Sequence, residues 1–398
     1  MKQFYSAIFF VAFFAFASGS AAQCTSCTIT ISSNNSANHI VTSGTTLCIT
    51  STGTASGLIT VASGGTLCNQ GTINSSNLWV AGGTLNNHGT INTSNILTSS
   101  GGTFNNYGTA TVDSLLITEP NSKLLNYNTI NDNRFGVTDG AIATNNGNIT
   151  ANYMGDSIGV VINNGTIVIN MDFGNGYNSS FTNNGNFTVN NDFSNGYSAT
   201  FLNDGYFKVA RDFYNGNLGT FTALCMGIVQ RDWYNSATIA GPATTSCGGF
   251  NVTGQTLNSG TIGTSSQHVD ICDAGTAGAI DANIGTIAST TTYCACSNSC
   301  INTVGIGEIA ESDIMIGNLY PNPAEKNIFL HIKGNRSENI SIEVYDMVGK
   351  RKIAVAESIG NSDNIINVDI SALAQGAYIL SVTDSKGLKS RKLFNVTR

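Results

Sequence analysis

The chain has 398 residues, of which 41% are hydrophobic and only 10% charged, with 44 Gly and 4 Pro. So little charge beside this hydrophobic content excludes a disordered solvated chain, which needs the opposite balance. The net charge of −7 argues against nucleic acid as a partner, because binding a phosphate backbone requires a basic surface.

Residues 1–22 have the pattern of a secretory signal peptide. A positively charged start precedes an apolar or small-residue core at 4–17, and Ser20 and Ala22 are small residues placed to suit cleavage. The core is too short to cross about 30 Å of hydrocarbon, which disfavours a membrane anchor. We therefore expect the mature chain to begin after Ala22, in an oxidising compartment.

The region that follows is a repeat of about 20 residues per period. The string Asn-x-Gly recurs, with an apolar residue two positions before each Asn and another two positions after each Gly. Its Asn positions are Asn69, Asn87, Asn106, Asn145, Asn163, Asn183 and Asn203, and Asn126, with Asn128 in place of the Gly, fills the one gap. A third apolar column follows at Leu78, Ile96, Leu115, Phe135, Tyr153, Phe173, Phe193, Phe213 and Trp233.

Three apolar columns per period predict three short strands and three corners in each coil of a parallel β-solenoid. The apolar columns would point inward with coils about 4.8 Å apart, and the Asn amides would hydrogen-bond along the stack. Gly at the corner would supply a positive φ. Parallel crossovers are nearly always right-handed, so we expect a right-handed parallel β-helix of roughly a dozen coils over residues 23–301. The pattern resembles that of right-handed parallel β-helix repeat proteins.

Four aspartates recur 20 positions apart in the strings DFGN, DFSN, DFYN and DWYN: Asp172, Asp192, Asp212 and Asp232. Stacked carboxylates raise one another's pKa or recruit a cation, so this ladder is a candidate calcium site. The favoured alternative is that each Asp caps its own corner while Arg211 and Arg231 offset the charge. No cofactor besides this calcium is expected.

Aromatic residues also accumulate in these coils, and exposed rings suit the flat faces of sugars. The candidates are Tyr177, Tyr197, Tyr206 and Tyr214. A catalytic patch would have to come from Lys208 and Arg211 with the neighbouring aspartates, for which a surface ion pair is the simpler explanation. No catalytic motif is found, so no catalytic residue is assigned.

The ten cysteines lie only in the first and last coils of the repeat. They are Cys24, Cys27, Cys48 and Cys68 at one end, and Cys225, Cys247, Cys272, Cys294, Cys296 and Cys300 at the other. Even numbers in an oxidising compartment predict disulfides that pin both ends, without fixing the pairing. Cys48 and Cys68 are one period apart and are expected to be stacked neighbours. Zinc is disfavoured because neither cluster has a nearby His in the sequence.

Composition changes abruptly after residue 313, where 11 of the 17 Lys and Arg residues are found. Alternating apolar patterns such as NIFLHIKG and ISIEVYDMVG, separated by turn signals, predict a small antiparallel β-sandwich at 317–398. The stretch 302–316 lacks both Cys and the Asn-x-Gly phase, so it is the expected linker.

The runs LYPNPA, IEVYDMVGKRK and VDISALAQGAYILSVTDSKGLKSRKLFNV closely resemble the C-terminal sorting domain of the type IX secretion system, an Ig-like sandwich. The resemblance implies that this domain directs the chain across the outer membrane and is then removed, and that the cargo is released or attached to surface lipopolysaccharide. The matching residues are Pro321, Asn322, Pro323, Gly349, Lys350, Gly376, Tyr378 and Lys392.

Together these features predict a secreted or surface-attached solenoid that reaches the outside of the cell through the periplasm. We expect an adhesin, structural or glycan-binding protein whose partners are the type IX machinery and extracellular glycans. The alternative is a polysaccharide lyase or hydrolase on the same scaffold, which would need a cleft lined by both basic and acidic groups. An ice-binding face is disfavoured because the Thr column is single and interrupted.

Overall fold

The computed structural model describes residues 24, 26–243, 246–275, 280–296, 314–320, 322, 324–334, 338–346, 350–359, 363–383 and 389–397. The predicted signal peptide, Cys300 and residues 302–313 of the predicted linker lie outside them. Every regular element in the described part is a β-strand. No helix found there has the length and apolar character to cross a membrane. The chain divides into two units, residues 1–300 and 301–398.

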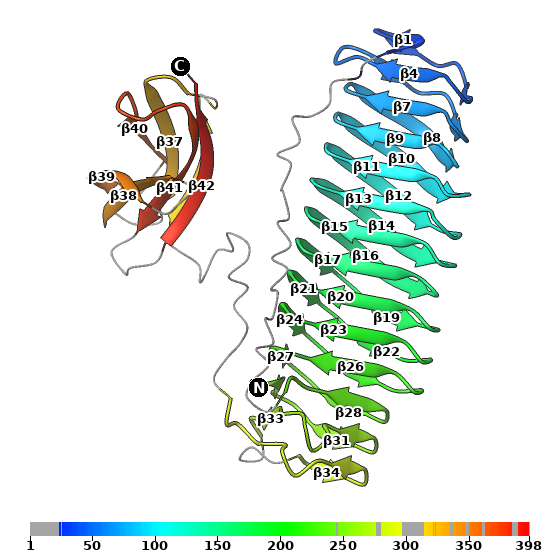
Figure 1. Cartoon of the computed structure of the whole chain (residues 1–398), viewed down its shortest axis with the longest axis vertical. Helices are drawn as coiled ribbons and strands as arrows, with labels where there is room; N and C mark the ends of the chain where they lie inside the picture. Colours follow the sequence, from blue (N-terminus) through cyan, green and yellow to red (C-terminus); the bar gives the residue numbers. More distant parts are fainter. Residues whose placement is uncertain are drawn as a thin grey trace, which may run out of the picture. The chain divides into compact units, whose positions relative to one another are not determined.

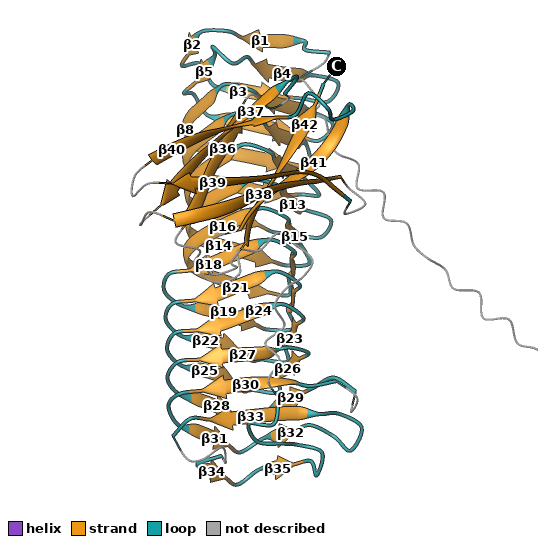
Figure 2. Ribbon diagram, turned by 90° about the vertical axis from the view of Figure 1, so that its left-hand side faces the viewer, coloured by secondary structure: helices purple, strands orange, loops and turns teal. Residues whose placement is uncertain are grey.

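The first unit is a parallel β-solenoid, as predicted, and its coils are stacked in Figures 1 and 2. One wall is a 14-stranded parallel sheet to which successive coils each contribute a strand. Its strands are β1 (Ile29–Ile31), β4 (Thr46–Ile49), β7 (Thr66–Asn69), β9 (Thr84–Asn87), β11 (Thr103–Asn106), β13 (Lys123–Asn126), β15 (Ile142–Asn145), β17 (Val160–Asn163), β20 (Ser180–Asn183), β23 (Thr200–Asn203), β26 (Thr220–Ala223), β29 (Thr238–Ala240), β32 (Thr261–Ile262) and β35 (Thr286–Ile287).

The other two walls change along the solenoid, from separate short strands in the first coils to single long strands and then back to separate strands. The first coils carry β2 (Asn34–Asn35), β3 (His39–Val41), β5 (Thr54–Ala55) and β6 (Ile59–Ala62), followed by single long strands β8 (Thr72–Ala81), β10 (Thr90–Ser99), β12 (Thr109–Ile117), β14 (Thr129–Thr138) and β16 (Asn148–Ser157). Later coils carry the pairs β18 (Thr166–Ile169) and β19 (Phe173–Gly176), β21 (Asn186–Val189) and β22 (Phe193–Asn195), β24 (Tyr206–Val209) and β25 (Phe213–Asn215), β27 (Met226–Val229) and β28 (Trp233–Asn235), β30 (Gly248–Val252) and β31 (Thr256–Asn258), and β33 (Val269–Asp273) and β34 (Ala282–Asn283). The prediction of three short strands in every coil is therefore wrong for the coils in which one long strand, β8, β10, β12, β14 or β16, replaces two short ones.

The three apolar columns lie in the core as predicted, with one exception. Met154, not Tyr153, occupies the third column between Phe135 and Phe173. Met154 is 3% exposed, whereas Tyr153 faces outward beside Arg134. Met154 and Phe173 are 19 residues apart, whereas a fixed 20-residue period counted back from Phe173 reaches Tyr153.

The predicted amide ladder runs through the coils that carry the Asn-x-Gly strings. From Asn69 to Asn203, each side-chain Nδ2 donates to the Oδ1 of the next Asn over 2.7–2.9 Å. These side chains are buried, so each bond satisfies polar atoms that would be costly to leave unpaired. The ladder ends where Ala223 follows Asn203 in the column.

The glycines of these strings serve a different purpose from the one predicted. At Gly89 a Cβ would lie 2.1 Å from the carbonyl oxygen of Gly71 in the preceding coil, and Gly108, Gly165 and Gly185 are equally close to theirs. None of them has a positive φ. Glycine is required here because the main chains of successive coils approach too closely for any side chain.

Disulfides close both ends of the solenoid. At the first end Cys24 pairs with Cys68 and Cys27 with Cys48. Cys48 and Cys68 are stacked neighbours as expected, although they do not pair with each other. At the other end the pairs are Cys247 with Cys296 and Cys272 with Cys294, and Cys225 is also disulfide-bonded.

The second unit contains two antiparallel sheets around their own core, as predicted for the sandwich. One is built from β36 (Ile314–Tyr320), β37 (Asn327–Gly334) and β40 (Asp363–Asp369), and the other from β38 (Glu338–Asp346), β39 (Arg351–Ile359), β41 (Gly376–Thr383) and β42 (Lys389–Val396). Strand β36 begins at Ile314, inside the predicted linker.

The residues of the sorting motif that the structure describes hold the ends of this sandwich together. Asn322 accepts a hydrogen bond from the backbone N–H of Asn395 (2.9 Å), and the N–H of Lys350 donates to Asp346 (2.9 Å). The Tyr378 hydroxyl donates to the carbonyl of Ala374 (3.0 Å). Gly376 opens β41, and Lys392 is exposed on β42. Pro321, Pro323 and Gly349 lie outside the described residues.

Candidate functional site

The repeated aromatic-x-Asn strands of the later coils present one side chain outward between two buried ones. In β25 the buried residues are Phe213 and Asn215, so Tyr214 between them faces solvent, and Tyr234 does so in β28. Pairing in register places the two tyrosines directly above one another. Their rings stack with centroids 5.0 Å apart and planes 8° from parallel.

The stack borders a groove of about 560 Å³ on the outer surface of these coils. Small residues, among them Ser194 and Gly196, line one end, and Leu257 and Ile284 line the other. Ser194, not another ring, precedes Tyr214 in the column. The face of Tyr214 on that side therefore has no aromatic partner within its column.

Beside the stack lies a row of carboxylates bridged by arginines. Arg231 donates to both carboxylate oxygens of Asp212, through Nε (2.6 Å) and Nη2. Its Nε also lies 3.9 Å from Asp232, and the Nε of Arg211 lies 3.6 Å from Asp192. Arg211 and Arg231 thus offset part of the negative charge of the four aspartates.

The tyrosine hydroxyls are tied to the same row. Tyr214 donates to Asp212 Oδ2 (3.2 Å) and Tyr234 to Asp232 Oδ2 (3.1 Å). Burial and these carboxylates raise the pKa of both phenols, so the hydroxyls stay protonated donors at neutral pH. Each ring is consequently held in a fixed orientation next to the groove.

Burial alone would raise the pKa of Asp212, but hydrogen bonds from Arg231, from the N–H of Asp232 and from Tyr214 lower it overall. Asp212 therefore stays an anion at neutral pH, and the stability it contributes would be lost only as the pH falls through its lowered pKa. A carboxylate held in this way accepts hydrogen bonds and is unsuited to act as a general acid.

The four stacked aspartates are brought together as the 20-residue spacing predicts, and their contacts are mainly structural. An Oδ1 of Asp172 accepts the backbone N–H of Asp192 (3.3 Å), and the same bond links Asp192 to Asp212 (3.2 Å) and Asp212 to Asp232 (3.3 Å). Asp232 in turn accepts the N–H of Gln255 (2.9 Å). Each carboxylate thus caps the corner of the next coil, and not its own corner as the sequence suggested.

Because these contacts already engage the carboxylates, we expect calcium and a chelator to leave the melting temperature of the mature protein unchanged. The melting curve should be recorded with calcium, with chelator and with neither. A rise with calcium that the double variant Asp192→Asn, Asp212→Asn removes would instead establish the calcium site predicted from the sequence.

The other candidates from the sequence lie apart from the groove lining. Lys208 sits on β24, in register with Thr188 and Ile228, and Tyr206 begins the same strand. Tyr177 and Tyr197 are exposed corner residues with positive φ, an unusual conformation for a bulky side chain. Of the four tyrosines proposed from the sequence, only Tyr214 borders the groove.

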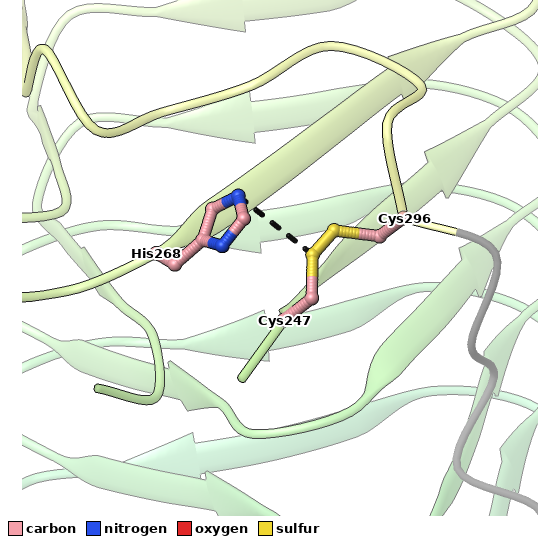
Figure 3. Close-up of side chains that lie close together, drawn as sticks. All are labelled: Cys247, His268 and Cys296. Atoms are coloured by element: carbon pink, nitrogen blue, oxygen red, sulfur yellow. Dashed lines mark hydrogen bonds between the residues drawn. A yellow bond between two sulfur atoms is a disulfide. The ribbon is translucent and has the colours of Figure 1, made fainter. Parts of the chain in front are cut away.

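A histidine lies beside a disulfide at the last coils (Figure 3). His268 Nε2 is 3.8 Å from Cys247 Sγ, which is bonded to Cys296, and 3.0 Å from Thr292 Oγ1. This proximity was not predicted from the sequence, although Cys247 and His268 are 21 residues apart, close to one period. Cys247, His268 and Cys296 have the donor atoms of a zinc site, but the two sulfurs are joined in a disulfide and are not thiolate ligands.

Comparisons with known proteins identify the second unit and leave the solenoid without an informative relative. Residues 318–395 match the family described as "Secretion system C-terminal sorting domain". No curated protein matches the chain. Among solved structures, the multi-modular cell-surface chitinase ChiW from Paenibacillus sp. str. FPU-7 matches with 12% identity and a TM-score of 0.17, over 93% of this chain and 24% of that one. The chain thus spans about a quarter of that enzyme, and a likeness this weak carries no argument.

The sorting domain indicates the export route of the protein. A domain of this family marks its chain for the type IX secretion machinery, so the protein is exported through the periplasm to the cell surface or the medium. The solenoid, with disulfides at both ends, is built for that oxidising environment.

Proposed function

We propose that the exported solenoid is a glycan-binding surface protein of the adhesin type, and that the groove beside Tyr214 and Tyr234 holds the sugar. The observation that carries this proposal is the stacked tyrosine pair at the edge of the groove, with one ring face toward small side chains. Sugar rings have flat apolar faces that pack on aromatic rings, while their hydroxyls need polar partners nearby.

The groove supplies both kinds of contact. Asn217 and Ser236 offer polar groups along its wall, and Leu257 and Ile284 offer apolar surface. The carboxylate row beside it and the low number of basic residues in the solenoid favour a glycan without acidic groups, because like charges repel. An extracellular neutral polysaccharide is the ligand class that fits best.

The enzyme alternative is less well supported by the same contacts. Asp212 and Asp232, the carboxylates tied to the groove tyrosines, are also bound by Arg231 and by the backbone. Such carboxylates hold structure in place and are not poised to transfer protons. We propose further that the sorting domain is removed after export by cleavage in the segment before Ile314, and that the solenoid is then released or attached to lipopolysaccharide.

Replacing Tyr214 by alanine should weaken glycan binding by about tenfold, because one ring stacking contact is lost. Binding of the solenoid should be measured on a glycan array and then by calorimetry with the best neutral oligosaccharide. Polysaccharide depolymerisation should be assayed in parallel, and we expect none.

The matched control is Tyr127→Ala. Tyr127 also belongs to a stacked pair with 5.0 Å between ring centroids, but its partner is Tyr107 and neither lines the groove. This control should bind like the wild type. Equal losses in both variants, or no neutral glycan bound at all, would contradict the proposal.

A further inference from the structure

A buried acid stands at the point where the core changes from aliphatic to amide side chains. Asp156 is on β16 and 6% exposed, with Val137 before it and Asn175 after it in the same inward column. From Asn175 onward the column is a second amide ladder, continuing through Asn195 and Asn215 with Nδ2 to Oδ1 distances of 2.6–2.8 Å. This second ladder was not predicted from the sequence.

The first rung of this ladder lacks the amide donor that the later rungs have. In later coils each Asn Oδ1 accepts from the amide of the coil before it, but the coil before Asn175 carries a carboxyl group. Ser179 Oγ lies 3.3 Å from Asp156 Oδ1, 2.8 Å from Asn175 Oδ1 and closer still to the carbonyl oxygen of Gly176. One hydroxyl hydrogen cannot serve three acceptors. Among the described residues, Asp156 Oδ2 has no partner at all.

We propose that Asp156 is a neutral carboxylic acid in the folded protein at neutral pH, and that its O–H supplies the donor missing from the first rung. The proton relieves the surplus of acceptors among Asp156, Asn175, Gly176 and Ser179. The acid thus stands in for an asparagine, and the solenoid takes up a proton when it folds.

The surroundings of Asp156 favour this neutral form. Its neighbours are Val137 on β14, Asn175 and Gly176 on β19, and Ser179 in the turn before β20, none of which is charged. Burial raises the pKa from 3.8 to about 8, against weaker opposing hydrogen bonds from the Gly176 N–H and from Ser179. No charged side chain is among the causes of this shift.

A pH dependence of stability follows. The folded state keeps this proton up to about pH 8, whereas the unfolded chain releases it near 3.8. Between these values the folded state binds more protons, so this group lowers the free energy of unfolding as the pH rises. Below pH 3.8 Asp156 is protonated in both states, so it causes no change in the free energy of unfolding with pH. Above about pH 8 it is ionised in both states, and the decrease in the free energy of unfolding is complete.

The test compares the wild-type protein with Asp156→Asn between pH 5 and 9. Asparagine supplies the donor without titrating, so the melting temperature of the variant should exceed that of the wild type by a margin that grows up to pH 8, to at least about 5 °C. Asp113→Asn, which changes an exposed carboxylate on β12, should follow the wild-type profile. Parallel profiles for wild type and Asp156→Asn would overturn the proposal.

Infrared spectroscopy observes the proton directly and does not depend on stability. At pH 7 the difference between wild type and Asp156→Asn should contain the C=O band of a protonated carboxyl group. Asp156→Val, which copies the neighbouring Val137, provides a second subtraction if the asparagine variant folds poorly. Absence of the band, or calcium or sodium chloride raising the melting temperature of wild type alone at pH 7, would show that Asp156 is ionised and overturn the proposal.

Discussion

Replacing Phe193 by alanine should lower the free energy of unfolding of the solenoid by about 4 kcal/mol. Phe193 is fully buried, and its ring stacks between those of Phe173 and Phe213, each with a centroid 5.1 Å away. The main chain cannot collapse into the cavity left behind, because hydrogen bonds to the coils on both sides fix its spacing. An aspartate at the same position should prevent the central coils from folding, since an unpaired charge would be buried.

Denaturant unfolding of the mature protein measures this effect. Ser194→Ala, at the next position and facing solvent, is the matched control and should change the free energy of unfolding by less than about 0.5 kcal/mol. A loss under about 1 kcal/mol for Phe193→Ala would mean that the aromatic column is not packed as described.

Deleting residues 314–398 should abolish surface exposure and leave a folded solenoid in the periplasm. The deleted strands form their own two sheets and core, so the solenoid keeps all of its internal contacts. A signal peptide carries a chain no further than the periplasm, and the sorting domain is the part that matches the secretion family. Cell fractionation and surface proteolysis would measure the distribution.

The reciprocal experiment places residues 302–398 behind a signal peptide and a fluorescent protein in a host that has the type IX system. That cargo should reach the surface, and mass spectrometry should show mature protein ending before Ile314, without the peptide NIFLHIK. A truncated chain that still reached the surface would refute the sorting role. Abundant surface protein still carrying Arg398 would refute the cleavage.

The parts of the fold that recur at a fixed spacing could be predicted from the sequence. Asn-x-Gly and its flanking apolar residues have one arrangement that buries all of them, so the inward columns and the amide ladder followed directly. Tyr153 was misplaced because it lies 20 residues before Phe173, whereas the residue that pairs with Phe173 is Met154, 19 residues before it. The spacing between the second and third columns lengthens at this coil, from five residues between Ile149 and Met154 to six between Ile167 and Phe173. A constant period hides such a local change.

The candidate site was harder to predict because it depends on outward residues. Tyr214 was a candidate because it is aromatic, but its stacking on Tyr234 was not predicted. The groove exists because small side chains such as Ser194 interrupt the outward column, and this depends on the exact register of the coils. The Asn at the end of each DFGN-type string was not predicted to form a ladder, although Asn175, Asn195 and Asn215 have the same 20-residue spacing as the aspartates. His268 and Cys247 are not neighbours in the sequence. Their contact could be predicted only from their separation of 21 residues, which is close to one coil.

The close approach of successive glycines has a consequence for how such a protein can change in length. Because each glycine fits only against a coil of the same outline, as Gly89 does against Gly71, segments can be gained or lost only as whole coils in phase. Each duplicated coil would extend the rod by about 4.8 Å and leave the surface of every other coil unaltered. The number of coils can therefore change while the residues that line the groove stay the same.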